Sequence, residues 1–458
     1  MPFPRVSLSS FLSSAKNALN VAIKNGEKVT FVVGNESADL DSICSAVLLA
    51  YLRTYSPRNR TKALYIPLSN LPAADLGLRP ELNPVLERAK LRVGDLLSLD
   101  DLRGGLNAEG TKWILVDHNA LQGELGKVYE ERVRGCIDHH DEEGKVPNKE
   151  VCEAEGEMRI IEKSGSCASL VIGWGKGDLT EMGKGGEGDL RSWEAELAYL
   201  ALGPILIDTN NLQSKDKTRD SDIDAVQFLE SLIEKAPKIS ETPWNRDQYF
   251  SSITTAKEDI GQMGLRDILR KDYKQWNEKE MNLGISAVVQ DITFLLSKAG
   301  SNEKFLQVLG EWGGEKKLDI CAVMTTSQRE GVFRRELLVW ALGEKGVECL
   351  KRFKRDGEEK LGLRVWGEGL LDLNKNGNGE KEMRNCWWQE RIENTESEES
   401  HSLPGTSTAF HVSSIFPEPL MLGLNWHNQE HSENLDIAHD ALLTITKKIL
   451  CHELRQDL

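Results

Sequence analysis

The sequence contains no long hydrophobic run and no closely spaced pair of cysteines. None of its apolar stretches approaches the roughly 20 residues that a membrane-spanning helix needs, so we expect no membrane span. Its eight cysteines are scattered, and none belongs to a C-x-x-C pair. This spacing argues against a disulfide framework and against a thiolate zinc site. It favours free thiols in a reducing compartment.

The sequence also has fewer basic than acidic residues. Lys and Arg number 57 against 73 Asp and Glu, which gives a formal net charge of −16. A surface for a nucleic-acid duplex is therefore not indicated, and a polyanion could bind only through local cations or metal ions. The first 28 residues lack acids before Glu27, as in mitochondrial transit peptides. We favour an amphipathic helix over 11–25, ended by Gly26, because a strand-like run follows it immediately. We therefore predict a cytoplasmic protein, with the mitochondrial matrix as the alternative.

Periodicity predicts an α/β domain over residues 1–235. Strand-like runs at 29–33, 62–66, 112–116 and 132–137 alternate with helical stretches at 42–54, 81–90 and 193–202. This alternation is typical of a parallel sheet with helices on both faces. We expect 175–189, which is rich in Gly and charge, to be a surface loop and 223–235 to be a closing helix.

A second domain is predicted over 247–392, after a linker at 236–246. It has helical stretches at 250–260 and 264–269 and strand-like runs at 283–289, 318–324 and 331–340, which indicate a smaller mixed α/β fold. From 393 to 458, Glu, Ser, Thr and His accumulate and the periodicity weakens. We expect this tail to be divergent, either disordered or frame-shifted.

Acids and histidines follow four apolar runs of the first domain. If these runs are neighbouring parallel strands, or feed one edge of the sheet, the side chains converge where α/β folds bind ligands. Each group alone could be a helix cap or a turn. However, the chain has only three histidines before residue 400, and all three lie in these groups. The groups are Asp39 and Asp41 after 29–33, Asp117 and His118 after 114–116, Asp138, His139 and His140 after 133–137, and Asp208 after 205–207.

This combination of ligands suits a pair of divalent cations. Several carboxylates with one or two imidazoles can hold two ions, and such sites favour Mg²⁺ or Mn²⁺ over thiolate-bound zinc. The ions would lower the pKa of a bridging water, clamp a phosphate and stabilise the charge of the transition state. The pattern therefore predicts two-metal hydrolysis of a phosphate substrate.

The four groups together resemble the motifs of the DHH phosphoesterase superfamily. The closer resemblance is to the branch that holds type II inorganic pyrophosphatases, eukaryotic exopolyphosphatases and prune-like proteins, and it covers residues 29–225. It implies a catalytic site in the cleft between a parallel-sheet DHH domain and the smaller domain. It also implies that Asp117 bridges two Mn, Mg or Co ions and that His140 faces the substrate phosphate. The implied metal ligands are Asp39, Asp41, Asp117, His139 and Asp208.

Asn35 separates the members of this branch. Pyrophosphatases of this type carry a metal-binding His after the glycine of the first motif, whereas this chain has Asn35 after Gly34, which resembles fungal exopolyphosphatase. An amide oxygen is a weaker ligand than imidazole, so the first metal site should be looser. The resemblance thus implies release of terminal orthophosphate from inorganic polyphosphate. The alternatives are hydrolysis of pyrophosphate or of a nucleotide phosphoester, and a prune-like binding protein with little turnover.

Further phosphate contacts are implied by two segments. Residues 269–276 resemble an Asp-x-Lys motif of the DHH-associated C-terminal domain, whose Lys reaches a phosphate across the cleft. This implies Lys274, with Arg270 and Lys271 as secondary contacts; a basic surface strand is the alternative. Ser166 lies in 165–169, at the start of an apolar helix whose backbone N–H groups could face an anion. A capped packing helix is the alternative there.

The Ser-Arg-Lys motif that closes the second domain of this family is missing. Acids at Glu390, Glu393 and Glu396 stand where cations are expected. Two explanations compete. In the first, the enzyme has diverged and become impaired; in the second, the reading frame shifts near 390–396. Codons for 397–403 can be read as Ala-Arg-Lys-Val-Thr-Pro-Phe in another frame, and an uninterrupted transcript through 380–410 would contradict the second explanation.

Overall fold

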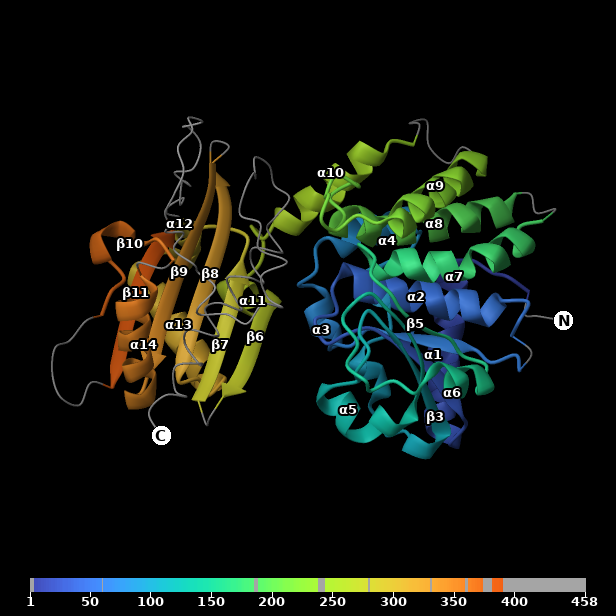
Figure 1. The fold of residues 1–458 in the computed structure, drawn as a ribbon, viewed down its shortest axis with the longest axis horizontal. Coiled ribbons are helices and arrows are strands. Elements are labelled where there is room, and N and C mark those ends of the chain that lie inside the picture. The colour runs from blue at the N-terminus through green and yellow to red at the C-terminus, as the bar shows by residue number, and fades with distance from the viewer. Residues whose placement is uncertain are drawn as a thin grey trace, which may run out of the picture. The chain divides into compact units, whose positions relative to one another are not determined.

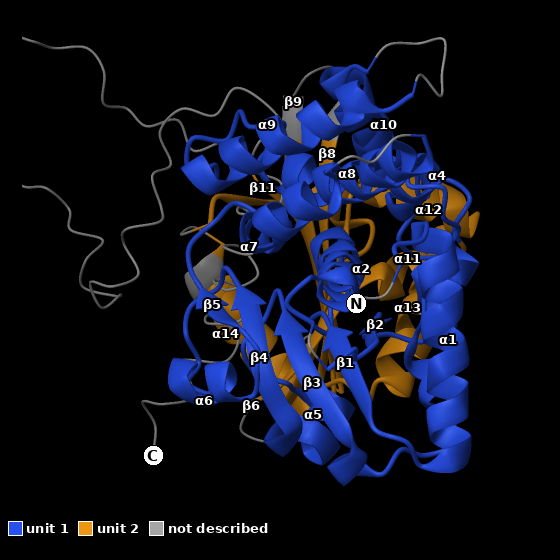
Figure 2. Ribbon diagram, turned by 90° about the vertical axis from the view of Figure 1, so that its right-hand side faces the viewer, with its two compact units in different colours: residues 1–263 blue, residues 264–458 orange. Residues whose placement is uncertain are grey.

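In the computed structural model the chain divides into two compact units, residues 1–263 and 264–458 (Figure 2). The structure describes residues 4–59, 61–184, 188–237, 244–278, 281–329, 332–358, 361–373 and 381–389. Helix α10 (Arg246–Glu258) belongs to the first unit, because the Tyr249 hydroxyl donates to the Tyr199 carbonyl at 2.8 Å. The division therefore lies further along the chain than the predicted linker at 236–246, of which 238–243 are outside the described residues.

A five-stranded parallel sheet forms the centre of the first unit. Its order is β2-β1-β3-β4-β5. Consecutive residues such as Phe31, Val32 and Val33 are fully buried, so both faces of the sheet are covered, as in other parallel sheets. The predicted run at 29–33 coincides with β1, whereas the run at 62–66 is displaced. The strands are β1 (Val29–Val33), β2 (Tyr65–Leu68), β3 (Thr111–Val116), β4 (Val133–Asp138) and β5 (Arg159–Ile161).

Helices surround this sheet (Figure 1). The amphipathic helix predicted at 11–25 is α1, which buries Leu8, Phe11 and Leu19 in the core and ends at Gly26 with φ 69°. Helix α2 contacts β1 and β2 and packs against α7 and α8. The helices are α1 (Leu8–Asn25), α2 (Leu40–Tyr55), α3 (Ala73–Leu76), α4 (Leu82–Arg88), α5 (Gly123–Tyr129), α6 (Lys149–Ala154), α7 (Cys167–Met182), α8 (Asp189–Asp208) and α9 (Asp220–Lys235).

Two predictions for this unit are wrong. Residues 175–189 were expected to form a loop, but α7 continues to Met182, and Gly175 allows it to approach α2: an added Cβ would lie 2.6 Å from Leu52 Cδ1. The run at 205–207 was expected to resemble a strand, but it lies in α8, where Ile205 and Leu206 are fully buried. A short apolar run fits a buried helix as well as a buried strand.

The strand order places a topological switch point between β1 and β3. From β1 the sheet extends to β2 on one side and to β3, β4 and β5 on the other. The segments that follow β1, β3 and β4 therefore leave from the same, carboxyl, edge of the sheet. In open α/β sheets this is where ligands bind.

The second unit is built on a six-stranded mixed sheet, as predicted. Its order is β10-β11-β9-β8-β7-β6, and only the β7–β8 pair is parallel. The strands are β6 (Asp272–Glu278), β7 (Met281–Val288), β8 (Ile320–Arg329), β9 (Val332–Leu342), β10 (Leu363–Val365) and β11 (Glu382–Gln389). The helices are α11 (Leu265–Lys271), α12 (Ile292–Ala299), α13 (Asn302–Glu315) and α14 (Glu344–Gly357).

The predicted tail at 393–458 and the acids of 390–396 lie outside the described residues. Among the residues that are described, no helix combines the length and apolar character needed to cross a membrane.

Candidate metal centre

The loop after β1 turns tightly back onto the start of α2. Gly34 permits this approach, because an added Cβ would lie 2.6 Å from Ser42 Cβ. Asp39 is the N-cap of α2, and its Oδ1 accepts the Ser42 backbone N–H at 2.9 Å. Asp39 therefore does cap the helix, which was one of the two interpretations of this residue. This does not exclude a second role, because a capping carboxylate retains lone pairs for another ligand.

Asp117 follows β3 in a left-handed backbone conformation, with φ 62°. Such a conformation is uncommon for residues other than glycine and persists where neighbours hold it. Here Oδ2 accepts the Ser42 hydroxyl at 2.6 Å and the Asn35 amide at 2.9 Å. Burial, followed by the charge of Asp39, raises the pKa of Asp117 to about 7. A cation near this carboxylate would relieve both effects.

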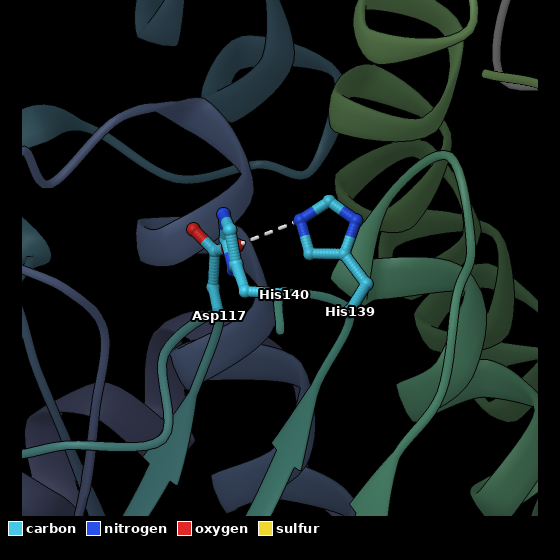
Figure 3. A group of neighbouring side chains, drawn as sticks. All are labelled: Asp117, His139 and His140. Carbon is cyan, nitrogen blue, oxygen red and sulfur yellow. Dashed lines mark hydrogen bonds and ion pairs between the residues drawn. The ribbon is translucent and has the colours of Figure 1, made fainter. Parts of the chain in front are cut away.

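His139 faces the other oxygen of Asp117. Its Nε2 lies 3.1 Å from Asp117 Oδ1 (Figure 3), while its Nδ1–H donates to the Ser164 carbonyl at 2.9 Å. Burial lowers the pKa of His139, but the Asp117 hydrogen bond and the Asp41 charge outweigh it and raise the pKa to about 10. The Ser164 contact fixes the ring so that Nε2 is directed into the site, as is usual for metal-binding histidines.

His140 is held differently. Its Nδ1–H donates to Asp138 Oδ1 at 2.8 Å, and this hydrogen bond raises the pKa of His140. Its side chain is 54% exposed, and the ring stands beside Asp117 (Figure 3). Asp138 is fully buried and also accepts the Asn119 amide at 2.6 Å. Asp138 therefore orients His140, whose second nitrogen is left for an external partner.

Asp41 accepts hydrogen bonds from the N–H groups at the start of α7. Its oxygens accept the backbone N–H of Cys167 at 2.6 Å and of Ala168 at 3.0 Å, and the Ser166 hydroxyl at 2.9 Å. The anion that we expected at this helix terminus is thus Asp41, not a substrate phosphate. Ser166 is fully buried and bound to Asp41, which corrects its expected role as a substrate contact.

Asp208, the last residue of α8, has a buried oxygen in need of a partner. Its Oδ2 has no hydrogen-bond partner among the residues that the structure describes. Burial and the charges of Asp41 and Asp39 raise its pKa well above the usual value. A buried carboxylate beside further carboxylates is costly unless a proton or cation compensates it. The acids and His139 therefore fit a site for divalent cations.

The Asn35 amide is hydrogen-bonded on both sides. Its Oδ1 accepts the Ala38 backbone N–H at 3.1 Å, while its Nδ2 donates to Asp117. The amide has to face this way, because Ala38 offers a donor and Asp117 an acceptor. Asn35 therefore holds Asp117 through its NH₂ group, while its amide oxygen accepts one hydrogen bond from Ala38.

The basic residues predicted to bind phosphate lie in the second unit. Lys274 is on β6, opposite Ile285 of β7, and its role stays a prediction. Lys271 is buried, with its Nζ 2.9 Å from Asp272 Oδ2. Arg270 Nη2 lies 3.0 Å from Asp267 Oδ1. The buried ion pair gives Lys271 a structural role in place of the secondary phosphate contact that we expected.

Several residues around the site were not identified from the sequence. Ser42 could have been found, because it follows Asp41 directly in the first motif. Asp222 gave no signal beyond its place in the first turn of α9. Residues of this kind act on the acids and on His139 through contacts between distant segments, which periodicity does not reveal.

Comparison with known families and proteins agrees with this geometry. Residues 29–202 match the family described as "DHH family, N-terminal domain", and residues 251–397 match the "DHHA2 domain". A candidate exopolyphosphatase of Schizosaccharomyces pombe is 29% identical over 365 residues, covering 78% of this chain and 90% of its own.

Two further relatives are more distant. Exopolyphosphatase PRUNE1 of Rattus norvegicus is 29% identical over 282 residues, which cover 61% of this chain and 56% of its own length. This chain thus spans little more than half of that relative. The manganese-dependent inorganic pyrophosphatase of Methanocaldococcus jannaschii is 26% identical, with coverage of 60% and 77%.

Proposed function

Because the chain belongs to the DHH phosphoesterase superfamily and joins a DHH domain to a DHHA2 domain, we propose that it is a metal-dependent exopolyphosphatase. The reaction is the hydrolytic release of terminal orthophosphate from inorganic polyphosphate. A relative named as a candidate exopolyphosphatase, matched over 90% of its length, supports this substrate class.

One observation carries the proposal: Asp117, His139 and His140 offer ligand atoms that lie within 4.8 Å of one another, and the charges of Asp39 and Asp41 are near enough to raise the pKa of Asp117. The buried, unpartnered Oδ2 of Asp208 among the described residues, next to the charges of Asp41 and Asp39, supports a cationic occupant. The manganese dependence in the name of one relative supports Mn²⁺, with Mg²⁺ or Co²⁺ as substitutes. The residues that would hold two divalent ions are Asp39, Asp41, Asp117, His139 and Asp208.

The protein's own contribution is to hold these groups in place. Bound divalent ions would supply Lewis-acid charge and lower the pKa of water. Ser42 and Asn35 bind Oδ2 of Asp117, so Oδ1 is the oxygen directed towards His139. His140, oriented through Nδ1, offers Nε2 as a donor to a phosphate oxygen. Lys274, on β6 of the second unit, remains our prediction for a further phosphate contact.

Asn35 favours polyphosphate over pyrophosphate. Its amide oxygen is a weaker ligand than the histidine that pyrophosphatases of this type have there, and it already accepts the Ala38 N–H. A metal site with a weaker ligand is looser, and we infer that it accepts the end of a longer phosphate chain. Hydrolysis of pyrophosphate or of a nucleotide phosphodiester remains the alternative within the enzyme class.

Product analysis tests the proposal. The full chain is incubated with medium-length polyphosphate, pyrophosphate and a cyclic dinucleotide, each with Mn²⁺, Mg²⁺ or Co²⁺. We expect orthophosphate from polyphosphate at the highest rate, with loss of the activity on chelation and in the Asp117→Ala variant. Faster hydrolysis of pyrophosphate or of the dinucleotide would identify that compound, and not polyphosphate, as the substrate. Activity that survives Asp117→Ala would overturn the metal-centre assignment.

A second function is favoured by the acids at the end of the DHHA2 domain. Glu390, Glu393 and Glu396 stand where the family has Ser-Arg-Lys, and like charge there opposes a polyanion. A binding protein with little turnover would suit this change. The same assay separates the two functions, because such a protein binds Mn²⁺ yet releases no orthophosphate from any of the three substrates.

A further inference from the structure

We infer that Asp222, on α9, is a positioning residue for the metal centre. The inference rests on the proposed function and adds a residue outside the segments that carry the ligands. Asp222 lies in the first turn of α9 and is fully buried. It acts on the centre through the turn at residues 164–168, which lies between Asp222 and the ligands His139 and Asp41.

Asp222 binds this turn with both of its oxygens. Oδ1 accepts the Ser164 hydroxyl at 2.9 Å and the Ser166 N–H at 3.3 Å, and Oδ2 accepts the Gly165 N–H at 2.9 Å. Gly165 allows the approach, because an added Cβ would lie 2.7 Å from Asp222 Oδ2. Three donors of three consecutive residues thus converge on one buried carboxylate.

The far side of the turn contacts both ligands. The Ser164 carbonyl accepts Nδ1–H of His139 at 2.9 Å and so sets the direction of Nε2. The Ser166 hydroxyl and the Cys167 N–H donate to Asp41, at 2.9 and 2.6 Å. A shift of the turn would therefore rotate the imidazole and move the carboxylate together. Metal-binding histidines depend on such outer contacts.

Asp222 also has a purely structural contact. Its Oδ2 accepts the Arg219 N–H at 2.8 Å, which helps to cap α9. If capping were its whole role, removal of the carboxylate would lower the unfolding temperature and leave metal affinity unchanged. Metal affinity, measured on folded protein, therefore separates the two roles.

The Asp222→Asn variant breaks the clamp with little change of shape. Each oxygen of Asp222 accepts two hydrogen bonds from N–H or O–H groups. Whichever oxygen the NH₂ group of asparagine replaces, it faces two donors in place of the acceptor that they had. We expect the affinity of the metal-stripped full chain for Mn²⁺, measured calorimetrically, to fall about 10- to 100-fold. Saturating Mn²⁺ should restore most of the turnover, because the ligands themselves are intact.

Two further variants complete the test. Asp224→Asn, an exposed acid of the same helix, should bind Mn²⁺ as the parent chain does. Ser164→Ala removes one hydroxyl of the clamp and keeps the carbonyl that contacts His139. It should weaken binding about 2- to 10-fold, the value of one hydrogen bond. If circular dichroism shows that Asp222→Asn is unfolded, Ser164→Ala decides the matter.

The outcomes separate this inference from the proposed function. If the parent chain binds Mn²⁺ and folded Asp222→Asn, or Ser164→Ala in its place, binds it equally tightly, the positioning role is overturned and the proposed function stands. If the parent chain binds no Mn²⁺, both are overturned. Weaker binding by Asp222→Asn with unchanged binding by Asp224→Asn supports the inference.

Discussion

Asp117 keeps an uncommon backbone conformation because its neighbours bind it from several sides. Ser42 and Asn35 hold one oxygen, His139 faces the other, and the backbone N–H donates to the Ile137 carbonyl at 3.1 Å. These contacts come from β1, β4 and the start of α2. The geometry of one acid therefore depends on three elements that pack correctly.

Ser42→Ala tests this dependence. The change removes the 2.6 Å donor to Asp117 and leaves the Asn35 N–H without its acceptor. We expect the Mn²⁺ concentration for half-maximal phosphate release to rise about 10- to 100-fold. The free energy of unfolding should fall by about 1–3 kcal/mol, the cost of an unsatisfied buried group.

The matched control for this change is Ser14→Ala. Ser14 is exposed on α1, and its hydroxyl donates only within its own helix, to Ser10. Both measurements should match the parent chain in that variant. An unchanged Mn²⁺ requirement in Ser42→Ala would show that Asp117 does not need this donor.

Some of these residues could be predicted from the sequence because the chain itself places them. Asp117 directly follows a strongly apolar β-run, and His139, Asp39 and Asp41 lie in the segments that leave two further runs of this kind, while parallel strands end at one edge. Ser164 and Asp222 could not be predicted, because their roles arise from a turn and a helix that meet only in the fold. The orientation of Asn35 likewise depends on Ala38 and Asp117 together.

The tight turn from β1 into α2 determines how closely Asn35 and Ser42 approach Asp117. Gly34→Ala should force this turn apart, because the new Cβ would lie 2.6 Å from Ser42 Cβ. We expect the unfolding free energy of the first unit to fall by about 1–3 kcal/mol, as in other overpacked sites. Denaturant titration followed by fluorescence measures it.

Gly173→Ala provides the opposite case. Gly173 lies within α7, is exposed, and an added Cβ would meet nothing within 4 Å. Alanine there should stabilise the protein by about 0.5–1 kcal/mol, because glycine is the weaker helix former. Equal effects of the two substitutions would contradict the close packing at Gly34.

For Asp208 the expected element is wrong, while its expected role as a metal ligand stays a prediction. The run before it, Ile205 to Ile207, was expected to resemble a strand, whereas it is the buried end of α8. Burial on all sides removes the periodicity that distinguishes a short helical segment from a strand. Asp208 reaches the other acids because α8 ends beside them.

At the scale of the whole molecule, the first unit carries the proposed metal ligands, and the DHHA2 domain carries Lys274, the predicted phosphate contact. The net charge of −16 means that a polyanion must be attracted locally, by bound cations and a few basic side chains. The acids of 390–396 work against this attraction. Of all features of the sequence, the acids at the end of the second domain therefore argue most strongly against the proposed activity.

Truncation after Gln389, the end of β11, tests whether the tail contributes. If residues 390–458 do not belong to the fold, the shortened chain should release orthophosphate from polyphosphate at the same rate as the full chain, or faster, since fewer acids oppose the substrate. A large loss of activity would mean that the tail supplies part of the phosphate site. Sequencing the transcript through codons 380–410 separately tests the frame-shift explanation.

The central claim is that the carboxyl edge of the first sheet holds two divalent cations. The number of Mn²⁺ ions bound per chain, counted by equilibrium dialysis with elemental analysis, tests it most directly. The account predicts two ions per chain at micromolar to millimolar Mn²⁺, and fewer than two in Asp117→Ala, because that change removes one of the proposed ligands. No bound Mn²⁺, or an unchanged count in Asp117→Ala, would contradict it.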